Sequence, residues 1–367
     1  MKSFAQAAVL IHVWSGQKVS SRNLGRIAEE VGLELVAQRD AAVDDFTHHR
    51  RHAEGVDPGH ELAAVFVDGG RVQTRATPSG PGVHGEAWKE DKITRLQTMR
   101  SPTHASDPCP EPLTCFLQPI LESAKTLGNP GPAETDLADV PPPRWQPEPL
   151  VRTCVATMRP LEDFRWMVQA EAKHRHFFTA KKRAFIADGS HGNWTRRDRH
   201  FPDFVPILDF VHAAEYLHAA AKALETPTRG CDWVRDLWQG RAAGVIEALR
   251  TALDAKGHGL ETLDETHEDF DLQRAWTYLS NHRDKLDSPR YRREGLPMTS
   301  SLMESQVKEF NLRVKGSEKF WHVEHAEAML QLIAETLRED GPTLSDRIDG
   351  RPVSPFRRST PTPTLVA

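Results

Sequence analysis

At 367 residues the chain can bury a substantial core, as one large domain with insertions or as two to three smaller ones. Its 47 Lys and Arg residues against 52 Asp and Glu residues mean that any contact with nucleic acid must depend on local basic patches. Four cysteines without a Cys-x-x-Cys pair suggest neither a zinc site nor a disulfide framework. No stretch approaches the roughly 18 apolar residues of a membrane span, so we expect a cytoplasmic protein.

The first 58 residues have a helical pattern. Ser20 and Ser21 are capping residues ahead of apolar positions with helical spacing, and Gly32 is placed to end that helix. This pattern is typical of one helix of a helix-turn-helix, and an ordinary amphipathic surface helix shows it equally well. We therefore interpret residues 1–58 as a small helical region that is a candidate for DNA binding.

Residues 61–76 change to an apolar run that ends at Asp68 and continues, after two glycines, as an alternating segment. This arrangement predicts a hairpin with Asp68 at the end of its first strand. Prolines and glycines then crowd residues 77–149, which we interpret as a Pro-rich insertion or mobile loop with one short helix near residues 116–127.

From residue 150 onward, strand and helix patterns alternate. In chain order we predict a strand at 150–158, a helix at 161–180, a buried strand at 183–188, a strand at 204–209 and helices at 213–255. With the upstream strands, this is the element order of an α/β fold with an RNase H-like mixed sheet. The chain stays largely helical to about residue 339, and residues 341–367 are expected to form a disordered tail.

Two acidic residues end predicted central strands. Asp68 and Asp188 each precede a glycine, where the backbone can turn and leave the side chain at the sheet edge. Mg²⁺ prefers such oxygen ligands, and a third carboxylate would complete a two-metal site. Each Asp-Gly pair is also what an ordinary turn after a strand looks like.

Glu304 is the candidate for the third carboxylate. Ser300 and Ser301 can cap a helix that has Glu304 in its first turn, although the spacing from Ser301 to Glu304 is equally that of a structural capping box. Downstream, and around Asp188, basic residues offer donors for DNA phosphates or form solvated basic faces. The candidate DNA-binding residues are Arg196, Arg197, Lys308, Arg313, Lys315 and Lys319.

Four segments resemble those of bacterial insertion-sequence transposases of the ISKra group, which are related to Mutator-like and other DDE enzymes. They are AVFVDGGRV, FIADGSHGNW, ILDFVHAAEYL and GLPMTSSLMESQVKEFNLRVKGSEKFW, and they cover residues 60–335 in the same order. The resemblance implies a catalytic and metal-binding triad of Asp68, Asp188 and Glu304, with two Mg²⁺ ions or Mn²⁺ in their place. It also implies that the predicted helices after the second aspartate are an all-helical insertion.

The resemblance implies DNA cleavage and strand transfer. The expected partners are the terminal inverted repeats and target DNA, with a homodimer or larger assembly on DNA, no membrane, and a place at the nucleoid. The implied domains are helical region 1–58, core 59–212 with insertion 77–149, helical insertion 213–295, core helices 296–340 and tail 341–367.

Asp209 and His212 are similar to the Cys/Asp-x-x-His element of Mutator-like transposases. The resemblance implies an accessory role in the active site; a pair that caps the next helix is the alternative. Asp209 also ends a strand and competes with Asp188 for the second metal-ligand position. We favour Asp188 because its strand comes first, as the RNase H order requires.

The chain departs from the family in two ways. It begins almost at the expected helix-turn-helix, so an upstream part of the DNA-binding domain is expected to be missing or reduced. It also has a Pro-rich stretch between strands that should be adjacent. An inactive copy that only binds DNA, and an RNase H-like nuclease without strand transfer, are therefore the two alternatives to an active transposase.

Overall fold

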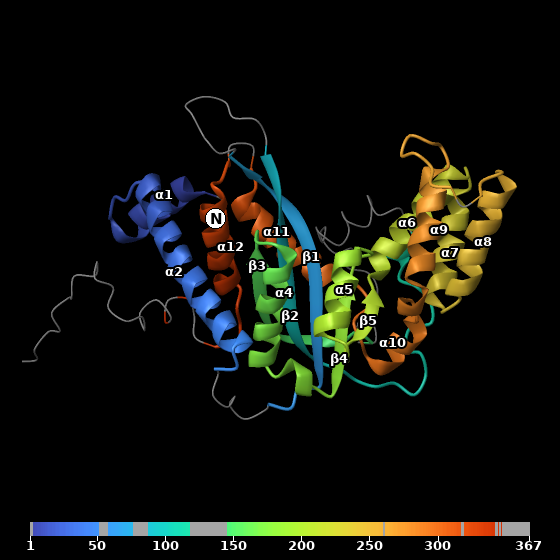
Figure 1. Ribbon diagram of the computed structural model, residues 1–367, viewed down its shortest axis with the longest axis horizontal. Helices are drawn as coiled ribbons and strands as arrows, with labels where there is room; N and C mark the ends of the chain where they lie inside the picture. Colours follow the sequence, from blue (N-terminus) through green and yellow to red (C-terminus); the bar gives the residue numbers. More distant parts are fainter. Residues whose placement is uncertain are drawn as a thin grey trace, which may run out of the picture.

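A computed structural model describes residues 3–50, 58–75, 87–117, 145–259, 261–316, 319–341, 344 and 346. The described part is a sheet covered by helices, with a group of helices at one end (Figure 1). Most of the expected tail 341–367 lies outside the described residues. No helix among the described ranges is both long and apolar enough to span a bilayer.

The sheet has five strands in the order β3-β2-β1-β4-β5. The strands are β1 (Leu62–Thr74), β2 (Ala87–Arg100), β3 (Glu148–Thr157), β4 (Lys182–Ala187) and β5 (Val205–Leu208). β1, β2 and β3 pair antiparallel, whereas β4 pairs parallel to both β1 and β5. Three antiparallel strands followed by two parallel ones are the mixed sheet of an RNase H-like fold, which confirms the predicted fold class.

The predicted hairpin at Asp68 is wrong. β1 continues without a turn through Gly69 and Gly70, which pair with Lys92 and Asp91 of β2. β2 itself lies inside residues 77–149, so that range is not wholly an insertion. The error arises because a glycine pair inside a strand has the same local sequence as a turn. Of the helix predicted near residues 116–127, only the short 3-10 helix η1 (Thr114–Leu117) falls within the described residues.

Helices pack along the sheet from β3 to β4. α4 (Leu161–His174) contacts β2 and β3, and α5 (His191–His200) contacts β4. α11 (Ser301–Val314) packs on β1 and β2, and α12 (Val323–Thr336) packs on β3. The helices therefore bury the long apolar strands, of which Leu62 to Phe66 are at most 1% exposed.

The helices between β5 and α11 form the separate group in Figure 1. They are α6 (Phe210–Ala223), α7 (Pro227–Trp238), α8 (Ala242–Ala255), α9 (Phe270–Asn281) and, after the 3-10 helix η3 (Arg283–Lys285), α10 (Ser288–Glu294). Trp238 is fully buried and packs against Phe116 and Phe210, with ring centroids 5.6 and 4.9 Å away. Aromatic packing thus joins these helices to the segment that follows β2.

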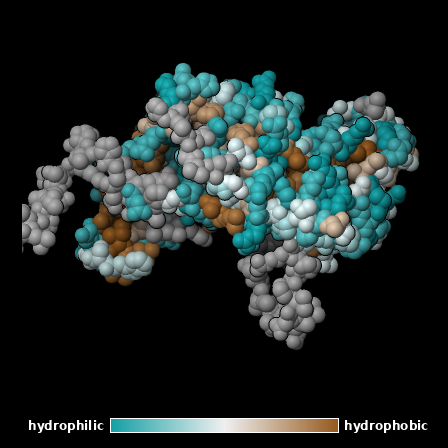
Figure 2. Space-filling model, turned by 90° about the horizontal axis from the view of Figure 1, so that it is seen from below, coloured by the Kyte–Doolittle hydropathy of each residue, from teal (hydrophilic) through white to brown (hydrophobic). Residues whose placement is uncertain are grey.

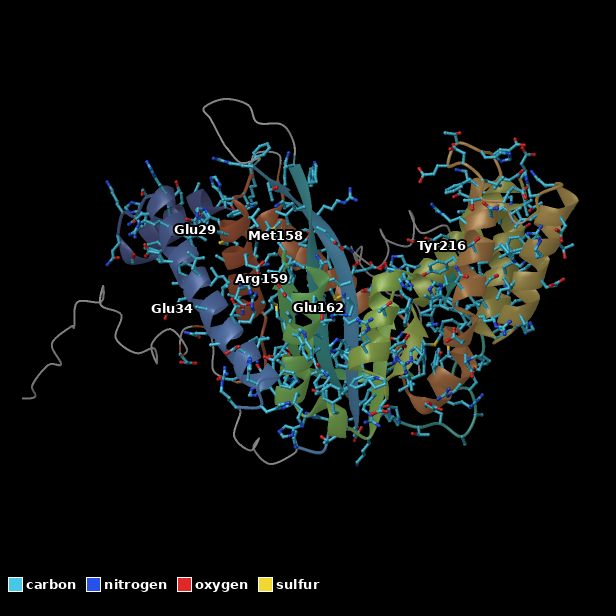
Figure 3. All side chains as sticks on the ribbon, viewed as in Figure 1. Glu29, Glu34, Met158, Arg159, Glu162 and Tyr216 are labelled. Carbon is cyan, nitrogen blue, oxygen red and sulfur yellow. The ribbon has the colours of Figure 1, made fainter. Side chains whose placement is uncertain are left out.

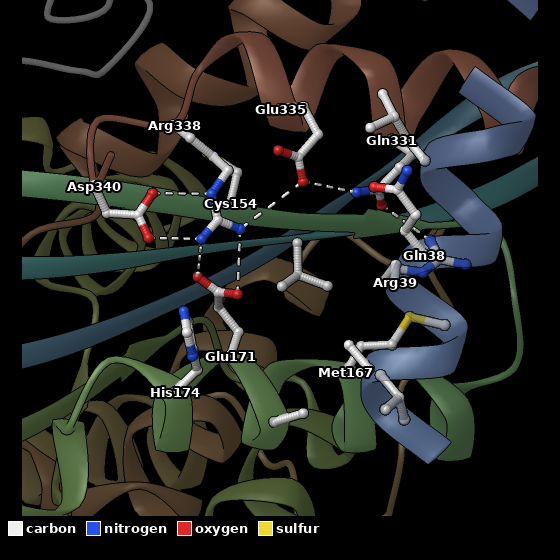
Figure 4. A pocket seen from close by; sticks show the side chains of 15 residues that line it. Gln38, Arg39, Cys154, Met167, Glu171, His174, Gln331, Glu335, Arg338 and Asp340 are labelled. Atoms are coloured by element: carbon white, nitrogen blue, oxygen red, sulfur yellow. Dashed lines mark hydrogen bonds and ion pairs between the residues drawn. The ribbon is translucent and has the colours of Figure 1, made fainter. Parts of the chain in front are cut away.

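The N-terminal helices α1 (Phe4–Ser15) and α2 (Ser21–Thr47) meet the core through α2, which runs along α12 and α4. Ser20 caps α2 as predicted, but the helix does not end at Gly32. Arg159, labelled in Figure 3, lies between β3 and α4 and pairs with Asp40 of α2 at 2.5 Å. On α1 the apolar side chains Val13 and Trp14 are exposed. Figure 2 shows brown, hydrophobic residues at several places on the face that it draws, one of them near the left end of the molecule.

Gly32 lies where α2 packs tightly against Ala328 of α12. A Cβ atom at this position would lie 2.4 Å from the carbonyl oxygen of Ala328, so a backbone group would have to move. The glycine is therefore explained by close helix packing rather than by a helix end.

We predict that Gly32→Ala lowers the free energy of unfolding by about 1–3 kcal/mol through overpacking. Gly25→Ala on the same helix is the matched control, because its Cβ would meet only the Phe4 ring at 3.5 Å. Urea denaturation of both variants measures the difference. Equal stability of the two variants would show that α2 does not depend on this contact.

Candidate active site

The parallel pairing of β1 and β4 brings Asp68 and Asp188 together. The preceding residues, Val67 and Ala187, are register partners, so the two aspartates occupy equivalent positions on neighbouring strands. Both line one cleft of about 520 Å³, together with Asn193 and Arg196 of α5. The expectation that the two acids meet at one part of the sheet therefore agrees with the geometry.

Asp68 and Asp188 have different surroundings. Burial raises the pKa of the Asp68 carboxyl; the Asp188 and Asp209 charges add to this, while a hydrogen bond from Gly69 N–H and the His212 charge oppose it. Asp188 Oδ1 accepts hydrogen bonds from Asn193 Nδ2 at 2.8 Å and from Ser190 N–H at 3.1 Å. These bonds fix the Asp188 side chain where β4 passes into α5.

Glu304 lies in the first turn of α11. Burial raises the pKa of its carboxyl, and the Asp209 charge adds to this effect, whereas Lys308 and His212 oppose it. The capping box from Ser301 to Glu304 is not realised, because the N-cap of α11 is Ser300, one residue earlier, and the Ser300 side chain makes no capping hydrogen bond. Its hydroxyl instead donates to Asp209 Oδ2 at 2.8 Å.

Glu304 does not line the cleft that Asp68 and Asp188 share, although the charges of Asp209 and His212 act on both Asp68 and Glu304. The ligand oxygens of the three acids do not all lie within 4.8 Å of one another. The donor set nevertheless fits Mg²⁺, which takes oxygen ligands and keeps several waters. The raised pKa values of Asp68 and Glu304 reflect burial and the repulsion of nearby carboxylates, and a divalent cation would relieve this repulsion.

Asp209 and His212 form a buried pair beside these acids. Asp209 is fully buried and accepts bonds from His212 Nδ1 at 2.5 Å and from Ser300 N–H and Oγ at 2.8 Å. Both Asp209 oxygens are thereby occupied, and this leaves Asp188 as the better candidate for the second ligand position. Asp209 also accepts a hydrogen bond from Val211 N–H at the start of α6. Asp209 therefore caps this helix and pairs with His212 at the same time.

The pair keeps opposite charges. Burial opposes ionisation of both groups, but their mutual hydrogen bond and attraction outweigh it, so the pKa of Asp209 is lowered and the pKa of His212 is raised to about 9. Protonated His212 therefore stabilises the fold fully below about pH 6.5, the usual pKa of histidine. This contribution is lost as the pH rises through about 9.

Asp91 was missed by the sequence reasoning. It is fully buried on β2, and neither carboxylate oxygen has a hydrogen-bond partner. Burial raises the pKa of Asp91, the Lys315 charge lowers it, and the Asp68 charge raises it. A Cβ at Gly70 would lie 2.9 Å from Asp91 Oδ1 and 3.2 Å from Lys315 Nζ. The glycine thus lets a lysine of α11 approach β1 beside Asp68. Residues 89–92 are all charged, a composition typical of a loop, so the sequence gives no sign that Asp91 lies in a buried strand.

The two arginines expected to bind DNA, Arg196 and Arg197, have different surroundings. Arg196 is 2% exposed, stacks over the Phe164 ring at 4.6 Å, and has Nε and Nη1 without a hydrogen-bond partner. Burial lowers its pKa to about 10, so it remains a cation at neutral pH. Arg197 instead donates to the carbonyl oxygens of Pro202 and Phe204. Its guanidinium therefore holds the loop before β5.

Lys308 of α11 lies on one groove with two lysines that follow the helix, and we call this the α11 groove. An open hollow of about 660 Å³ is lined by Lys308, Asn311, Leu312, Lys315 and Lys319. Lys308 is exposed, whereas Lys319 Nζ donates to the Arg313 carbonyl oxygen at 2.9 Å and Arg313 Nη1 to that of Glu309 at 2.7 Å. Lys308 and Lys315 are therefore the members of this set best placed for a ligand.

The fold and the site define an RNase H-like α/β protein with a carboxylate-lined cleft. No known protein family has a sequence model that matches the chain. A solved structure, the Drosophila P element transposase strand transfer complex, is similar with a TM-score of 0.33 and 10% identity over 91% of this chain and 92% of that chain. A likeness this weak carries no argument about function.

A short stretch is similar to a curated protein. Over 75 residues the chain is 36% identical to the molybdenum import ATP-binding protein ModC of Rhodopseudomonas palustris (strain BisB18), which is 20% of this chain and 19% of that protein. The chain thus spans about a fifth of that relative's length. The sequence has no Gly-x₄-Gly-Lys-Ser/Thr phosphate loop, so the similarity does not extend to an ATP site.

We predict that Asp209→Asn lowers the pKa of His212 by at least about 1, because the substitution removes the charge that holds the proton. Ring resonances of His212 followed by NMR over pH 5–10 measure this change. His200, whose pKa burial lowers, is the internal control and should not respond. Ser300→Ala keeps the pair intact and should leave His212 titrating near 9; a low His212 pKa in the unmodified protein would contradict the charged pair.

Proposed function

We propose that this chain is a DDE transposase that cleaves DNA at the ends of an insertion sequence and joins the freed 3′ hydroxyl to target DNA. The observation that carries the proposal is the placement of Asp68 and Asp188 at equivalent positions of two parallel central strands, facing one cleft. The resemblance of the four segments around these residues to insertion-sequence transposases supports it, and so does the RNase H-like strand order.

Asp68, Asp188 and Glu304 would hold Mg²⁺ or Mn²⁺ ions. Two such ions supply activation of the attacking oxygen and stabilisation of the leaving oxygen in phosphoryl transfer. The enzyme's own groups position the DNA. Arg196 lines the cleft as a cation, and its charge would attract a phosphate oxygen.

His212 is an accessory cation in this proposal. Its Nδ1 is held by Asp209, and the Asp188 and Glu215 charges help to keep it protonated. A second donor on the ring is then free to contact DNA near the metal site. Asp209 acts as a positioning residue, because it joins His212 to Ser300 at the start of the Glu304 helix.

The proposed DNA partners are the terminal inverted repeats and the target. The α11 groove continues away from Glu304 along the same helix and presents Lys308 and Lys315. Synapsis of two transposon ends requires at least a dimer on DNA. An RNase H-like nuclease without strand transfer uses the same acids, and a decayed copy would retain DNA binding alone, so the joined product separates the three cases.

We predict that Asp68→Asn, Asp188→Asn and Glu304→Gln each reduce cleavage and strand transfer by about 100-fold or more, since loss of a metal ligand costs several kcal/mol of transition-state stabilisation. The substrate is DNA with the flanking inverted repeats, supplied with Mg²⁺ or Mn²⁺. Asp203→Asn is the matched control, because Asp203 is 70% exposed and lies away from the cleft.

The outcomes separate the alternatives. Cleavage without joined product would favour the nuclease, and binding without cleavage in the unmodified chain would favour a decayed copy. Full activity of Asp188→Asn would remove that residue from the site.

We further predict that Lys308→Gln and Lys315→Gln weaken DNA binding for all sequences and each reduce the slope of log affinity against log salt concentration by about 1, because each releases one phosphate contact. Lys222→Gln on α6 is the control, an exposed lysine outside the groove. Fluorescence anisotropy at several salt concentrations measures the slopes. Unchanged slopes in both groove variants would place DNA elsewhere.

A further inference from the structure

A second cluster of ligand-type side chains lies far along the chain from the carboxylates. His258, His267 and Asp269 occupy the connection between α8 and α9, in the helical group at one end of the molecule (Figure 1). Within the described ranges this is the only set of three His, Cys, Asp or Glu residues whose ligand atoms all lie within 4.8 Å of one another. The cluster shares no residue with the carboxylate-lined cleft.

The distances suit a small metal ion. His258 Nε2 lies 2.8 Å from Asp269 Oδ2, and His267 Nδ1 lies 4.0 Å from the same oxygen. The two imidazole rings are nearly perpendicular, with centroids 5.1 Å apart. Tetrahedral Zn²⁺ with bonds of about 2.0–2.1 Å separates its ligand atoms by roughly 3.3 Å. The observed spacings lie on both sides of this value, so small side-chain rotations would complete the set.

The hydrogen bonds within this cluster can be replaced by bonds to a metal ion. His267 Nδ1 accepts a hydrogen bond from Asp269 N–H at 3.0 Å, so this nitrogen carries no proton, and its single lone pair would pass from that bond to the ion. Between His258 and Asp269 the ion would replace the shared proton. Lys256 Nζ contacts the other carboxylate oxygen, Oδ1, at 2.6 Å and leaves Oδ2 for the ion.

The connection is held in place before any ion binds. Arg250 of α8 donates to the carbonyl oxygens of His258 and Gly259. Gln273 of α9 accepts from Leu263 N–H at 2.7 Å and donates to the Glu261 carbonyl oxygen. A site already ordered in the free protein loses little conformational entropy on binding.

The local charge favours a cation over DNA. Residues 261–271 contain no Lys or Arg and are rich in acids, namely Glu261, Asp264, Glu265, Glu268, Asp269 and Asp271. Asp269 is 2% exposed, whereas the His267 side chain is 38% exposed, so an ion would reach the site from solvent. Phosphates would be repelled from the same surface.

We infer that His258, His267 and Asp269 bind one transition-metal ion, with Zn²⁺ as the best fit and water in the fourth position. Two imidazoles and one carboxylate favour Zn²⁺ over Mg²⁺, which prefers oxygen ligands alone. The ion joins the end of α8 to the start of α9. It stabilises the helical group and is independent of the Mg²⁺ proposed for the cleft.

The test uses the full chain after treatment with a chelator. Calorimetric titration with Zn²⁺ is expected to give one ion per chain, and Zn²⁺ but not Mg²⁺ should raise the melting temperature. Co²⁺ should give the visible absorption of a four-coordinate site. His258→Ala and His267→Ala should each weaken Zn²⁺ binding by at least about tenfold.

His322→Ala is the matched control. His322 and His325 have ring centroids 5.5 Å apart in a similar crossed geometry but belong to no cluster with a third ligand among the described residues. Circular dichroism checks that the variants are folded. Absence of Zn²⁺ binding to the unmodified chain, or equal affinity in the folded His258→Ala and His267→Ala variants, would overturn the inference. These measurements use neither DNA nor catalytic activity, so their outcome is independent of the proposed transposase function.

Discussion

The parallel contact between β1 and β4 is the constraint on which the candidate active site depends. A parallel ladder aligns the two strands residue by residue, so the pairing of Val67 with Ala187 places the next residue of each chain segment side by side. Those residues are Asp68 and Asp188. The apolar runs before them supply the burial that keeps the strands in this register, since a slip of one residue would turn buried side chains toward the other face.

The buried carboxylate of Asp209 connects α6 and α11 to this part of the sheet. Asp209 has no exposed surface, and its cost of burial is met by His212, Ser300 and the start of α6. Removing a partner from such a group leaves a charge without compensation, which is strongly destabilising. The same bonds therefore position Glu304, on the helix that begins at Ser300, relative to β4 and β5.

Charge is distributed unevenly over the chain despite a formal net value of -5. Arg196 lies in the carboxylate-lined cleft, and Lys308 and Lys315 follow Glu304 along α11. The connection between α8 and α9 is acidic and contains the histidine cluster. The two proposals, a surface for polyanions and a separate site for a cation, both depend on this separation, because screening limits each field to roughly 8–10 Å.

The order and type of most elements followed from the sequence, because apolar periodicity and capping residues are local properties. The strand ending before Asp188, the helix capped by Ser20 and the placement of Glu304 in a first helical turn are examples. Other features needed the tertiary structure. Gly69 and Gly70 continue strand β1 because they pair with β2. Gly32 lies within α2 because α12 packs too closely there for a larger residue. Asp91 joins the site only through pairing with β1. The partners of Asp209 at Ser300 and the meeting of His258 with Asp269 likewise depend on three-dimensional packing, which local sequence patterns do not encode.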